Sequence, residues 1–400
     1  MLNAQSSTGD TFNESSADNF FGVGGHAVGM SEAVTASVLD GTALLYNPAG
    51  LVRVKRPEFY GALSHERVKC ESDWLTPPSA SVSDDFAKTR LNTLSLVVPV
   101  PTYRGSLVVA FGVSRVKSFD RTFTFSSGTT DTFTEDALEQ AMGGIHEWSA
   151  GAAIELSPRL AVGATAIYYH GSEDYTWQYE AQGDFSTLGY DDEITSDYSG
   201  VGVRLGMIAE VNPYLSLGLS IDSPVRYGIN QEYVLDSIQN GVHYVVEDTY
   251  EYKLQHPFTF NAGAAFRLQT LTVEADIGYT DWSQLEYKNE DYKRHNRDLQ
   301  EYYSDAVQFR LGAEYVIPQY GVVLRGGFKH DPLPIAGTLL SNQIEKNRNS
   351  FSAGLGFLID KIVMLDIAYA RASYTLYDGE RDVSSKYTSD RVLLSVGYRI

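Results

Sequence analysis

The 400-residue sequence contains few of the features that usually give a first indication of function. Its single cysteine, Cys70, excludes an intramolecular disulfide. No apolar run reaches the length of about 18 residues that a transmembrane helix needs. The chain does not begin with a basic segment followed by an apolar one, so if the protein is exported, we expect a signal peptide to have been removed ahead of Met1.

Basic residues and catalytic motifs are also scarce. The 31 Lys and Arg residues are outnumbered by 51 Asp and Glu, which gives a formal net charge of -20. Because a nucleic-acid interface needs clustered basic side chains, we predict no nucleic-acid partner. The eight histidines are scattered without metal-binding spacing, and no phosphate-binding loop is present, so we predict no metal and no cofactor. His170, Ser172 and Glu173 are neighbours in sequence, which is not the geometry of a hydrolase triad, and we predict no enzymatic activity.

Alternation of apolar and polar residues is the feature that the sequence does have. Between residues 258 and 268, Phe258, Phe260 and Phe266 fall on one face, and Asn261 and Arg267 fall on the other. A period of two is typical of a β-strand with one apolar face. We count about fourteen such segments, each near the roughly 9–11 residues with which a tilted strand crosses a bilayer. They span residues 56–67, 90–100, 104–118, 145–156, 158–170, 199–211, 213–225, 255–268, 270–283, 303–317, 320–330, 349–360, 361–374 and 389–400.

The connections between these segments alternate in length, which favours an outer-membrane barrel. Some are very short, such as Ser157-Pro158 and Asn212-Pro213, and others are long and polar, among them 119–144, 171–198, 226–254 and 284–302. Short turns on one rim, long loops on the other and many aromatic residues, here including 27 tyrosines, are typical of such barrels. A large soluble β-sandwich is the alternative. Against it, small and charged residues share the polar face of many strands, as expected for a barrel lumen.

The chain before the first predicted strand differs from the remainder. Residues 1–18 are polar without periodicity, and we predict that they form a flexible lead. Residues 19–51 are rich in small residues and end in Asn47-Pro48-Ala49. We predict that they form a hatch inside a barrel made by residues 52–400. Asn-Pro is also a common turn, but we expect Asn47 to hydrogen-bond the barrel wall and hold the hatch in place.

Several stretches resemble the long-chain fatty-acid transporter (FadL/TodX-type) family of outer-membrane proteins. Residues 19–51 resemble the hatch of that family, which ends in Asn-Pro-Ala. Ser223-Pro224-Val225, Trp282-Ser283-Gln284 and the stretch 324–335 resemble motifs at the ends of its strands, in the same order. The resemblance implies an all-β fold, a transmembrane antiparallel β-barrel of fourteen strands with an N-terminal hatch in the lumen. It also implies uptake of hydrophobic molecules across the bacterial outer membrane.

The resemblance further implies that cargo leaves sideways through a kink in the third strand. The third predicted strand, 104–118, is apolar on both faces around four residues that we assign to this opening: Leu107, Val109, Phe111 and Gly112. Packing against the hatch would give the same pattern.

A cargo that carries a carboxylate would need a cation in the lumen, because an unpaired charge is costly in an apolar pocket. The candidates on the polar faces of strands are Arg204, Arg267, Arg310, Arg325 and Lys329. Alternatively, these side chains pair with lumen carboxylates, for which the candidates are Glu155, Glu210, Glu274, Asp276, Glu314 and Asp366.

We therefore predict an outer-membrane transporter for the passive uptake of hydrophobic or amphipathic small molecules such as long-chain fatty acids, with hatch rearrangement and lateral release. Its predicted partners are this ligand and outer-membrane lipid, and we expect a monomer. The barrel-assembly machinery is a third partner, because residues 391–400 resemble its terminal-strand signal, although Ile400 replaces the usual aromatic residue. The alternatives are a barrel scaffold for protein secretion, as in the related type IX shuttle, and a general diffusion porin.

Overall fold

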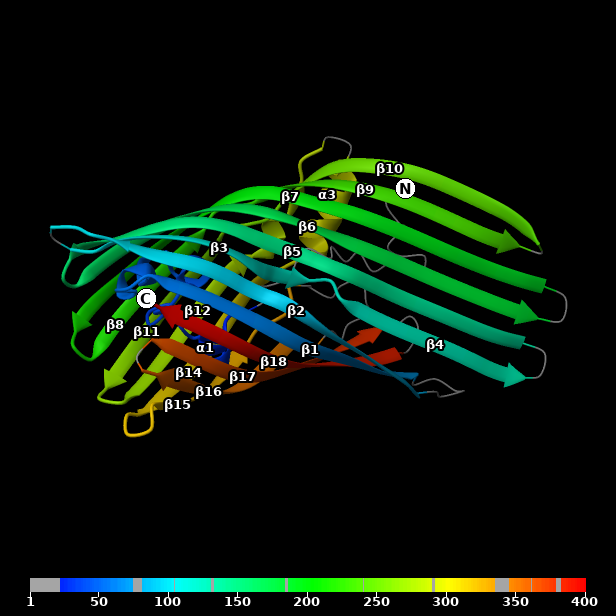
Figure 1. Ribbon diagram of the computed structural model, residues 1–400. Coiled ribbons are helices and arrows are strands. Elements are labelled where there is room, and N and C mark those ends of the chain that lie inside the picture. Colours follow the sequence, from blue (N-terminus) through cyan, green and yellow to red (C-terminus); the bar gives the residue numbers. More distant parts are fainter. Residues whose placement is uncertain are drawn as a thin grey trace.

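In the computed structural model, an antiparallel β-sheet closes into a barrel around the segment that precedes its first strand (Figure 1). The structure describes residues 22–74, 81–103, 105–130, 133–183, 186–239, 241–289, 292–334, 345–360, 362–378 and 383–400. The predicted lead, 1–18, lies outside these residues. The barrel is closed by its first and last strands, because β1 (Glu58–Trp74) pairs along its whole length with β18 (Val383–Arg399).

The barrel has the predicted fourteen strands, although the described residues form eighteen strand segments. Ten strands are uninterrupted. They are β1, β2 (Ser81–Val100), β5 (Phe133–Ser157), β6 (Leu160–Gly183), β7 (Ser186–Asn212), β14 (Asp305–Ile317), β15 (Val322–His330), β16 (Glu345–Ile359), β17 (Val363–Asp378) and β18.

Each of the other four strands is broken into two segments. The first is β3 (Leu107–Ser118) with β4 (Arg121–Thr130), both paired with β5. The second is β8 (Leu215–Asp222) with β9 (Arg226–Gln239), both paired with β7. The third and fourth are β10 (Val242–Gln255) with β11 (Thr259–Leu268), and β12 (Leu271–Asp281) with the two-residue β13 (Glu286–Tyr287).

The predicted alternation gives the barrel an apolar outer surface and a polar lumen. In β14, Phe309 and Leu311 are each 52% exposed on the outside, whereas Gln308 and Arg310 are buried in the lumen. Among the described residues, none of the helices is both long and apolar enough to cross a membrane.

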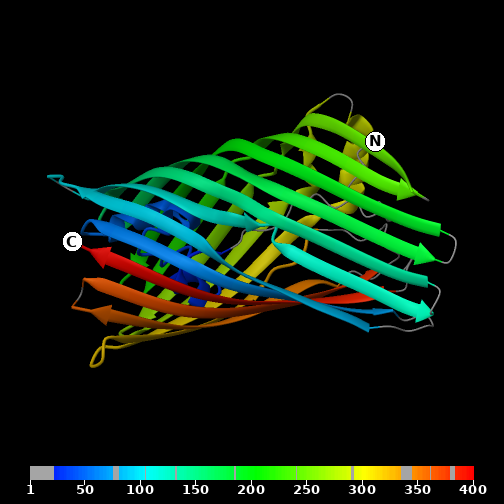
Figure 2. The same cartoon turned by 45° about the vertical axis from the view of Figure 1, so that its right-hand side comes forward.

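The predicted connections are only partly correct. The short turns are confirmed, since Ser157 pairs with Leu160 and Asn212 pairs with Leu215. However, much of the predicted loops 119–144, 171–198 and 226–254 is strand. β5, β6 and β7 have 25, 24 and 27 residues and extend well beyond the barrel end opposite the C-terminus (Figure 2). The outward face of these extensions carries exposed polar residues such as Asp174 and Asp197, so the sequence does not show the apolar alternation of a membrane strand.

The segment 22–54, which we call the hatch, lies inside the barrel near the end that carries the C-terminus (Figure 1). It contains α1 (Gly25–Gly29), α2 (Ala43–Tyr46) and the 3₁₀ helix η1 (Pro48–Arg53). Inward-facing glycines of the wall make room for it. A Cβ atom at Gly206 would lie 2.1 Å from Oδ1 of Asn47, and one at Gly312 would lie 2.6 Å from the carbonyl oxygen of Met30.

Candidate functional site

The hatch contacts the wall through the predicted Asn-Pro-Ala motif. Asn47 is fully buried, and its Nδ2 donates hydrogen bonds to the carbonyl oxygens of Thr35 (2.8 Å) and of Met207 on β7 (3.1 Å). Its Oδ1 accepts from the backbone nitrogen of Ala49 at 3.2 Å and so caps η1, which Pro48 begins. The predicted hydrogen bond between Asn47 and the wall is therefore confirmed.

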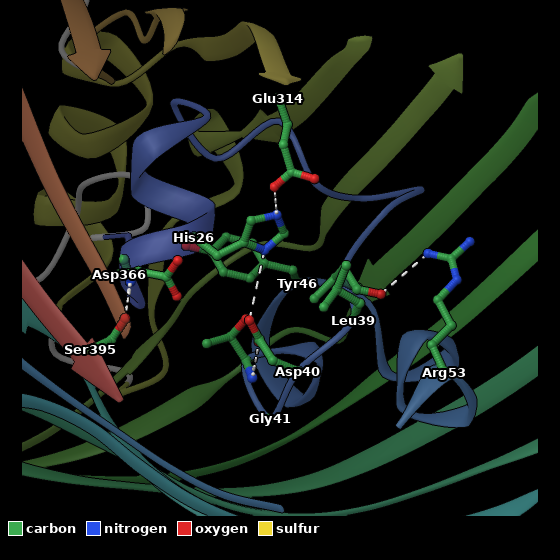
Figure 3. Close-up of polar contacts among 12 residues, drawn as sticks. His26, Leu39, Asp40, Gly41, Tyr46, Arg53, Glu314, Asp366 and Ser395 are labelled. Carbon is green, nitrogen blue, oxygen red and sulfur yellow. Dashed lines mark hydrogen bonds and ion pairs between the residues drawn. The ribbon is translucent and has the colours of Figure 1, made fainter. Parts of the chain in front are cut away.

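A histidine of α1 joins the hatch to the wall electrostatically. His26 lies between Asp40 of the hatch and Glu314 of β14, with nitrogen–oxygen distances of 3.7 Å and 3.3 Å (Figure 3). Burial and the nearby Arg325 lower the pKa of His26, but the two carboxylates outweigh them and raise it to about 9. His26 is therefore a cation at neutral pH, and it joins an ion-pair chain through Glu314 and Arg325 to Asp366.

Two predicted lumen carboxylates also hold the hatch. Oδ2 of Asp276 accepts hydrogen bonds from the backbone nitrogens of Val34 and Thr35, each at 3.0 Å. Oε1 of Glu274 accepts from that of Ala36 at 2.5 Å. These wall carboxylates therefore satisfy backbone groups that an irregular buried segment would otherwise leave unpaired.

Three of the five predicted ligand cations pair with carboxylates in the structure. Arg204 contacts Glu147 (3.0 Å), Asp222 (2.5 Å) and the carbonyl oxygen of Leu44 in the hatch (2.8 Å). Arg325 lies between Glu314 and Asp366, at 2.7 Å and 2.6 Å. Lys329 contacts Glu32 of the hatch at 2.9 Å. These contacts favour the alternative interpretation, a lumen ion-pair network. Of the predicted carboxylates only Glu314 and Asp366 take part in them, because Arg204 and Lys329 pair with carboxylates that were not predicted.

The other two predicted cations have neutral partners. Nη2 of Arg310 donates to Oδ1 of Asn261, and Nη1 of Arg267 donates to Oγ of Ser216 at 3.1 Å. Arg204 and Arg310 both border the cavity described next, whereas Arg267 does not. Ligand binding by any of the five remains a prediction.

A cavity of about 150 Å³, which we call the central cavity, lies directly against the hatch. Leu45 and Tyr46 of α2 form part of its surface. The remaining lining combines apolar and aromatic residues with charged ones. It includes Val116, Ile145, Tyr169, Val225, Tyr227, His256 and Trp282 as well as Glu32, Lys117, Glu147, Arg204 and Arg310.

The aromatic side of the central cavity comes from three neighbouring strand breaks. Pro224 and Pro257 lie in the gaps between β8 and β9 and between β10 and β11, and the 3₁₀ helix η2 (Trp282–Gln284) lies between β12 and β13. A proline cannot donate to the ladder, which explains the first two breaks. His256 lies between Tyr227 and Trp282, with ring centroids 4.8 Å and 5.4 Å away. Two of the motifs that carried the resemblance, at 223–225 and 282–284, therefore lie at this cavity.

A short helix packs against a cluster of aromatic residues that includes Tyr227, Tyr252, Trp282 and Tyr287. α3 (Lys293–Tyr302) buries Leu299 against it, and Tyr303 follows. The Asn296 side chain accepts from the backbone nitrogen of Tyr287 at 2.7 Å and donates to its carbonyl oxygen at 2.8 Å. This amide replaces a strand neighbour where β13 ends. This cluster was not predicted, and its signal in the sequence is aromatic residues beside prolines.

A second cavity of about 290 Å³, the side cavity, lies on the other side of the lumen. Its lining is mixed. Apolar and aromatic members are Val68, Phe119, Ala370, Ala372, Tyr374 and Tyr387, and charged members include Glu32, Glu66, Lys117, Asp120, Lys329 and Arg391. Glu32 and Lys117 border both cavities.

The wall beside the side cavity has a seam. β2 pairs with β3 only from Thr93–Ser114 to Val100–Leu107, and in the described part of the chain no backbone ladder joins β4 to β2. Side chains bridge the seam instead. Asp120, in the gap between β3 and β4, contacts Arg90 of β2 across the seam and Arg115 of its own strand β3, each at 2.8 Å.

The residues assigned to a lateral opening lie on β3, before the break that separates it from β4. Leu107, Val109 and Phe111 point outward, whereas Gly112 points inward, where a Cβ would lie 3.1 Å from Leu44 of the hatch. β3 remains paired on both sides at Gly112, so the interruption of the third strand is at Phe119–Asp120. Phe111 and Gly112 do line a groove of about 1120 Å³ on the outer surface, which is almost entirely apolar and includes Leu63, Leu94, Trp148 and Tyr168.

Comparison with known proteins assigns a family to this arrangement. Residues 4–390 match the family described as outer membrane protein transport protein (OMPP1/FadL/TodX). The chain belongs to this family. As a FadL/TodX-family member it is a transport protein of the bacterial outer membrane rather than an enzyme. No curated protein matches the sequence.

Solved structures of this family share the fold. A Pseudomonas aeruginosa FadL homologue is 13% identical with a TM-score of 0.66, and the match covers 96% of this chain and 100% of that one. The CymD monoaromatic hydrocarbon channel is 16% identical with a TM-score of 0.63, covering 96% and 99%. The Pseudomonas putida toluene transporter TodX is 15% identical with a TM-score of 0.61, covering 92% and 95%. At these identities the likeness concerns the fold alone.

Proposed function

We propose that this protein mediates the passive uptake of small hydrophobic molecules, of about the size of one aromatic ring, across the outer membrane. The observation that carries the proposal is the central cavity. Its volume of about 150 Å³ is about that of an engineered apolar protein cavity that binds benzene. Two fold relatives, a monoaromatic hydrocarbon channel and a toluene transporter, support this choice.

A longer amphipathic cargo, such as the predicted long-chain fatty acid, is the second candidate. Arg204 and Arg310 border the central cavity, and a guanidinium pairs well with a carboxylate. The side cavity offers further apolar surface for a chain.

We propose that cargo leaves through the seam between β2 and β4. The hatch occupies the lumen at the end of the barrel that carries the C-terminus, and in the described chain β4 is joined to β2 by side-chain contacts rather than by a backbone ladder. The outer groove at Phe111 offers a released apolar molecule a surface on the lipid side. The protein would act as a monomer surrounded by outer-membrane lipid, after insertion by the barrel-assembly machinery.

The test fills the central cavity. Ile145→Trp places an indole in it, and Val201→Trp, at a residue 69% exposed on the outer surface, is the matched control. We expect the parent and the control to bind toluene in native mass spectrometry or calorimetry and to accelerate toluene entry into cells with intact lipopolysaccharide. The cavity-filling variant should do neither. Equal toluene binding by both variants would contradict the proposal.

The same preparation distinguishes the other classes of barrel function. A diffusion porin would make liposomes swell in small sugars, whereas a barrel blocked by its hatch should not. A secretion scaffold would co-purify with a stoichiometric protein partner and would not require toluene binding.

A further inference from the structure

The partition between the two lumen cavities is formed by a side chain of the hatch. Glu32 and Lys117 are the residues that line both cavities within the described chain. Lys117 belongs to the wall strand β3, whereas Glu32 belongs to the hatch and can move with it. The Glu32 side chain is only 7% exposed although it borders two cavities.

The backbone under Glu32 is strained. Ser31 and Glu32 have φ values of 52° and 65°, in the left-handed region that side-chain-bearing residues rarely occupy. Such conformations persist where the surroundings enforce them, and they cluster at functional sites and switch segments. Here one of the two residues, Glu32, has a carboxylate that contacts the wall cation Lys329 and borders both cavities.

Two cations of the wall hold this carboxylate. Oε2 of Glu32 lies 2.9 Å from Nζ of Lys329, and Oε1 lies 3.9 Å from a guanidinium nitrogen of Arg391. Lys329 also contacts Asp331 at 3.2 Å, so it keeps a carboxylate partner if Glu32 moves away. The partition can therefore open without leaving a buried lysine unpaired.

We propose that Glu32 is an internal gate, which separates a cargo-binding central cavity from a side cavity that leads to the wall seam. The inference rests on the proposed function, because it orders the steps of that transport. Cargo binds against the aromatic side of the central cavity, passes Glu32 when the hatch turn relaxes, and enters the side cavity. Phe119 and Asp120 line the side cavity and also form the break in the third strand, so the side cavity opens directly onto the seam.

The first arm of the test removes the gate. Glu32→Gly deletes the side chain and places glycine where φ is positive, so the fold should tolerate it. The two cavities then merge, and biphenyl, which is too large for the central cavity alone, should bind about tenfold more tightly than to the parent, a gain of about 1.4 kcal/mol. Toluene should enter cells faster. Glu274→Gln is the matched control, because Glu274 binds the hatch at Ala36 and borders neither cavity.

The second arm blocks the side cavity. Ala372 lines it, and Ala372→Trp should leave toluene binding in the central cavity within about threefold of the parent while toluene entry falls about tenfold or more. Tyr369→Trp, on the outer face of the same strand, is the control.

The outcomes separate the gate from the proposed function. If the parent neither binds nor admits toluene, the proposed function fails. If the parent binds and admits toluene but Glu32→Gly binds biphenyl no better than the parent does, Glu32 is not the gate. Unchanged toluene entry in Ala372→Trp would overturn the route through the side cavity. A biphenyl gain in Glu274→Gln equal to that in Glu32→Gly would assign the effect to a loosened hatch and also refute the gate.

Discussion

Replacement of Asn47 by alanine should loosen the hatch without unfolding the barrel. The side chain makes three hydrogen bonds: to Thr35, to Met207 of the wall, and from Ala49. Alanine removes all three and leaves the buried carbonyl oxygen of Thr35 without this donor. The barrel ladders, including the closing pair of β1 and β18, do not involve Asn47.

The expected size follows from these contacts. A hydrogen bond contributes about 0.5–1.5 kcal/mol, and a buried group left unsatisfied costs about 1–3 kcal/mol. Because part of the loss is recovered by local relaxation and water, we expect hatch opening to become easier by about 2–4 kcal/mol. That range corresponds to a roughly 30- to 1,000-fold higher population of the open hatch.

Amide hydrogen exchange of the purified protein in detergent measures this population. The amides of Asn47 and Gly50, which donate within the hatch, should exchange faster by that factor, whereas the amides of β1 and β18 should not. Asn212→Ala is the control, because Asn212 caps a short turn through Tyr214 and Leu215 outside the hatch. Unchanged exchange of the hatch amides in Asn47→Ala would refute its anchoring role.

Three further predictions concern the seam, pH and ligand charge. Asp120→Asn removes the carboxylate that binds the guanidinium of Arg115, a side chain that is only 6% exposed. The loss of this buried pair should destabilise the seam by about 3–5 kcal/mol, which amide hydrogen exchange at residues 119–124 would show as faster exchange. The folded-state pKa of His26 is raised to about 9, so its stabilisation of the hatch is complete below about pH 6.5 and is lost as pH rises through about 9. Exchange of the hatch amides, corrected for intrinsic rates, should therefore increase above that pH. Arg310→Gln should weaken benzoate binding about tenfold or more relative to toluene, because a hydrogen bond to a charged group contributes about 1.5–3 kcal/mol.

Each of these has a control and a contradicting result. Asp174→Asn alters an exposed carboxylate of β6, and equal exchange at 119–124 in both variants would count against the seam. His26→Gln should abolish the pH step, and a step that persists in this variant would assign it to another group. Arg267→Gln removes a lumen guanidinium that does not border the central cavity, and an equal loss of benzoate binding would argue against a local contact.

Much of the barrel could be predicted because membrane strands follow one physical rule. Lipid on one side and lumen on the other impose a period of two, which is visible in Phe309 and Leu311 on the outside and Arg310 between them in the lumen. The Asn-Pro-Ala motif located the hatch anchor for a similar reason, since a fully buried asparagine needs hydrogen-bond partners and the wall carbonyl of Met207 provides one.

The parts that the sequence did not reveal depend on contacts between distant residues. The strand extensions of β5 to β7 carry polar residues on the outward face, where a membrane strand is apolar, so their pattern resembles that of a loop. The position of the seam depends on where the pairing of β2 with β3 ends. Asp120 lies beyond that point and contacts Arg90 and Arg115 there, which the sequence alone does not show. Similarly, strand parity placed Arg204, Arg325 and Lys329 in the lumen, but which carboxylates they meet depends on how the hatch is seated.

The central claim, that hydrophobic cargo passes through the central cavity, is tested most directly by the entry of radiolabelled toluene into cells. The cells have intact lipopolysaccharide and produce either the parent or Ile145→Trp at equal surface levels. We predict that the parent accelerates toluene entry, and that entry into cells with the cavity-filled variant falls to the rate of cells without the protein. Equal acceleration by both proteins would mean that hydrophobic cargo does not pass through the central cavity, and would contradict the account.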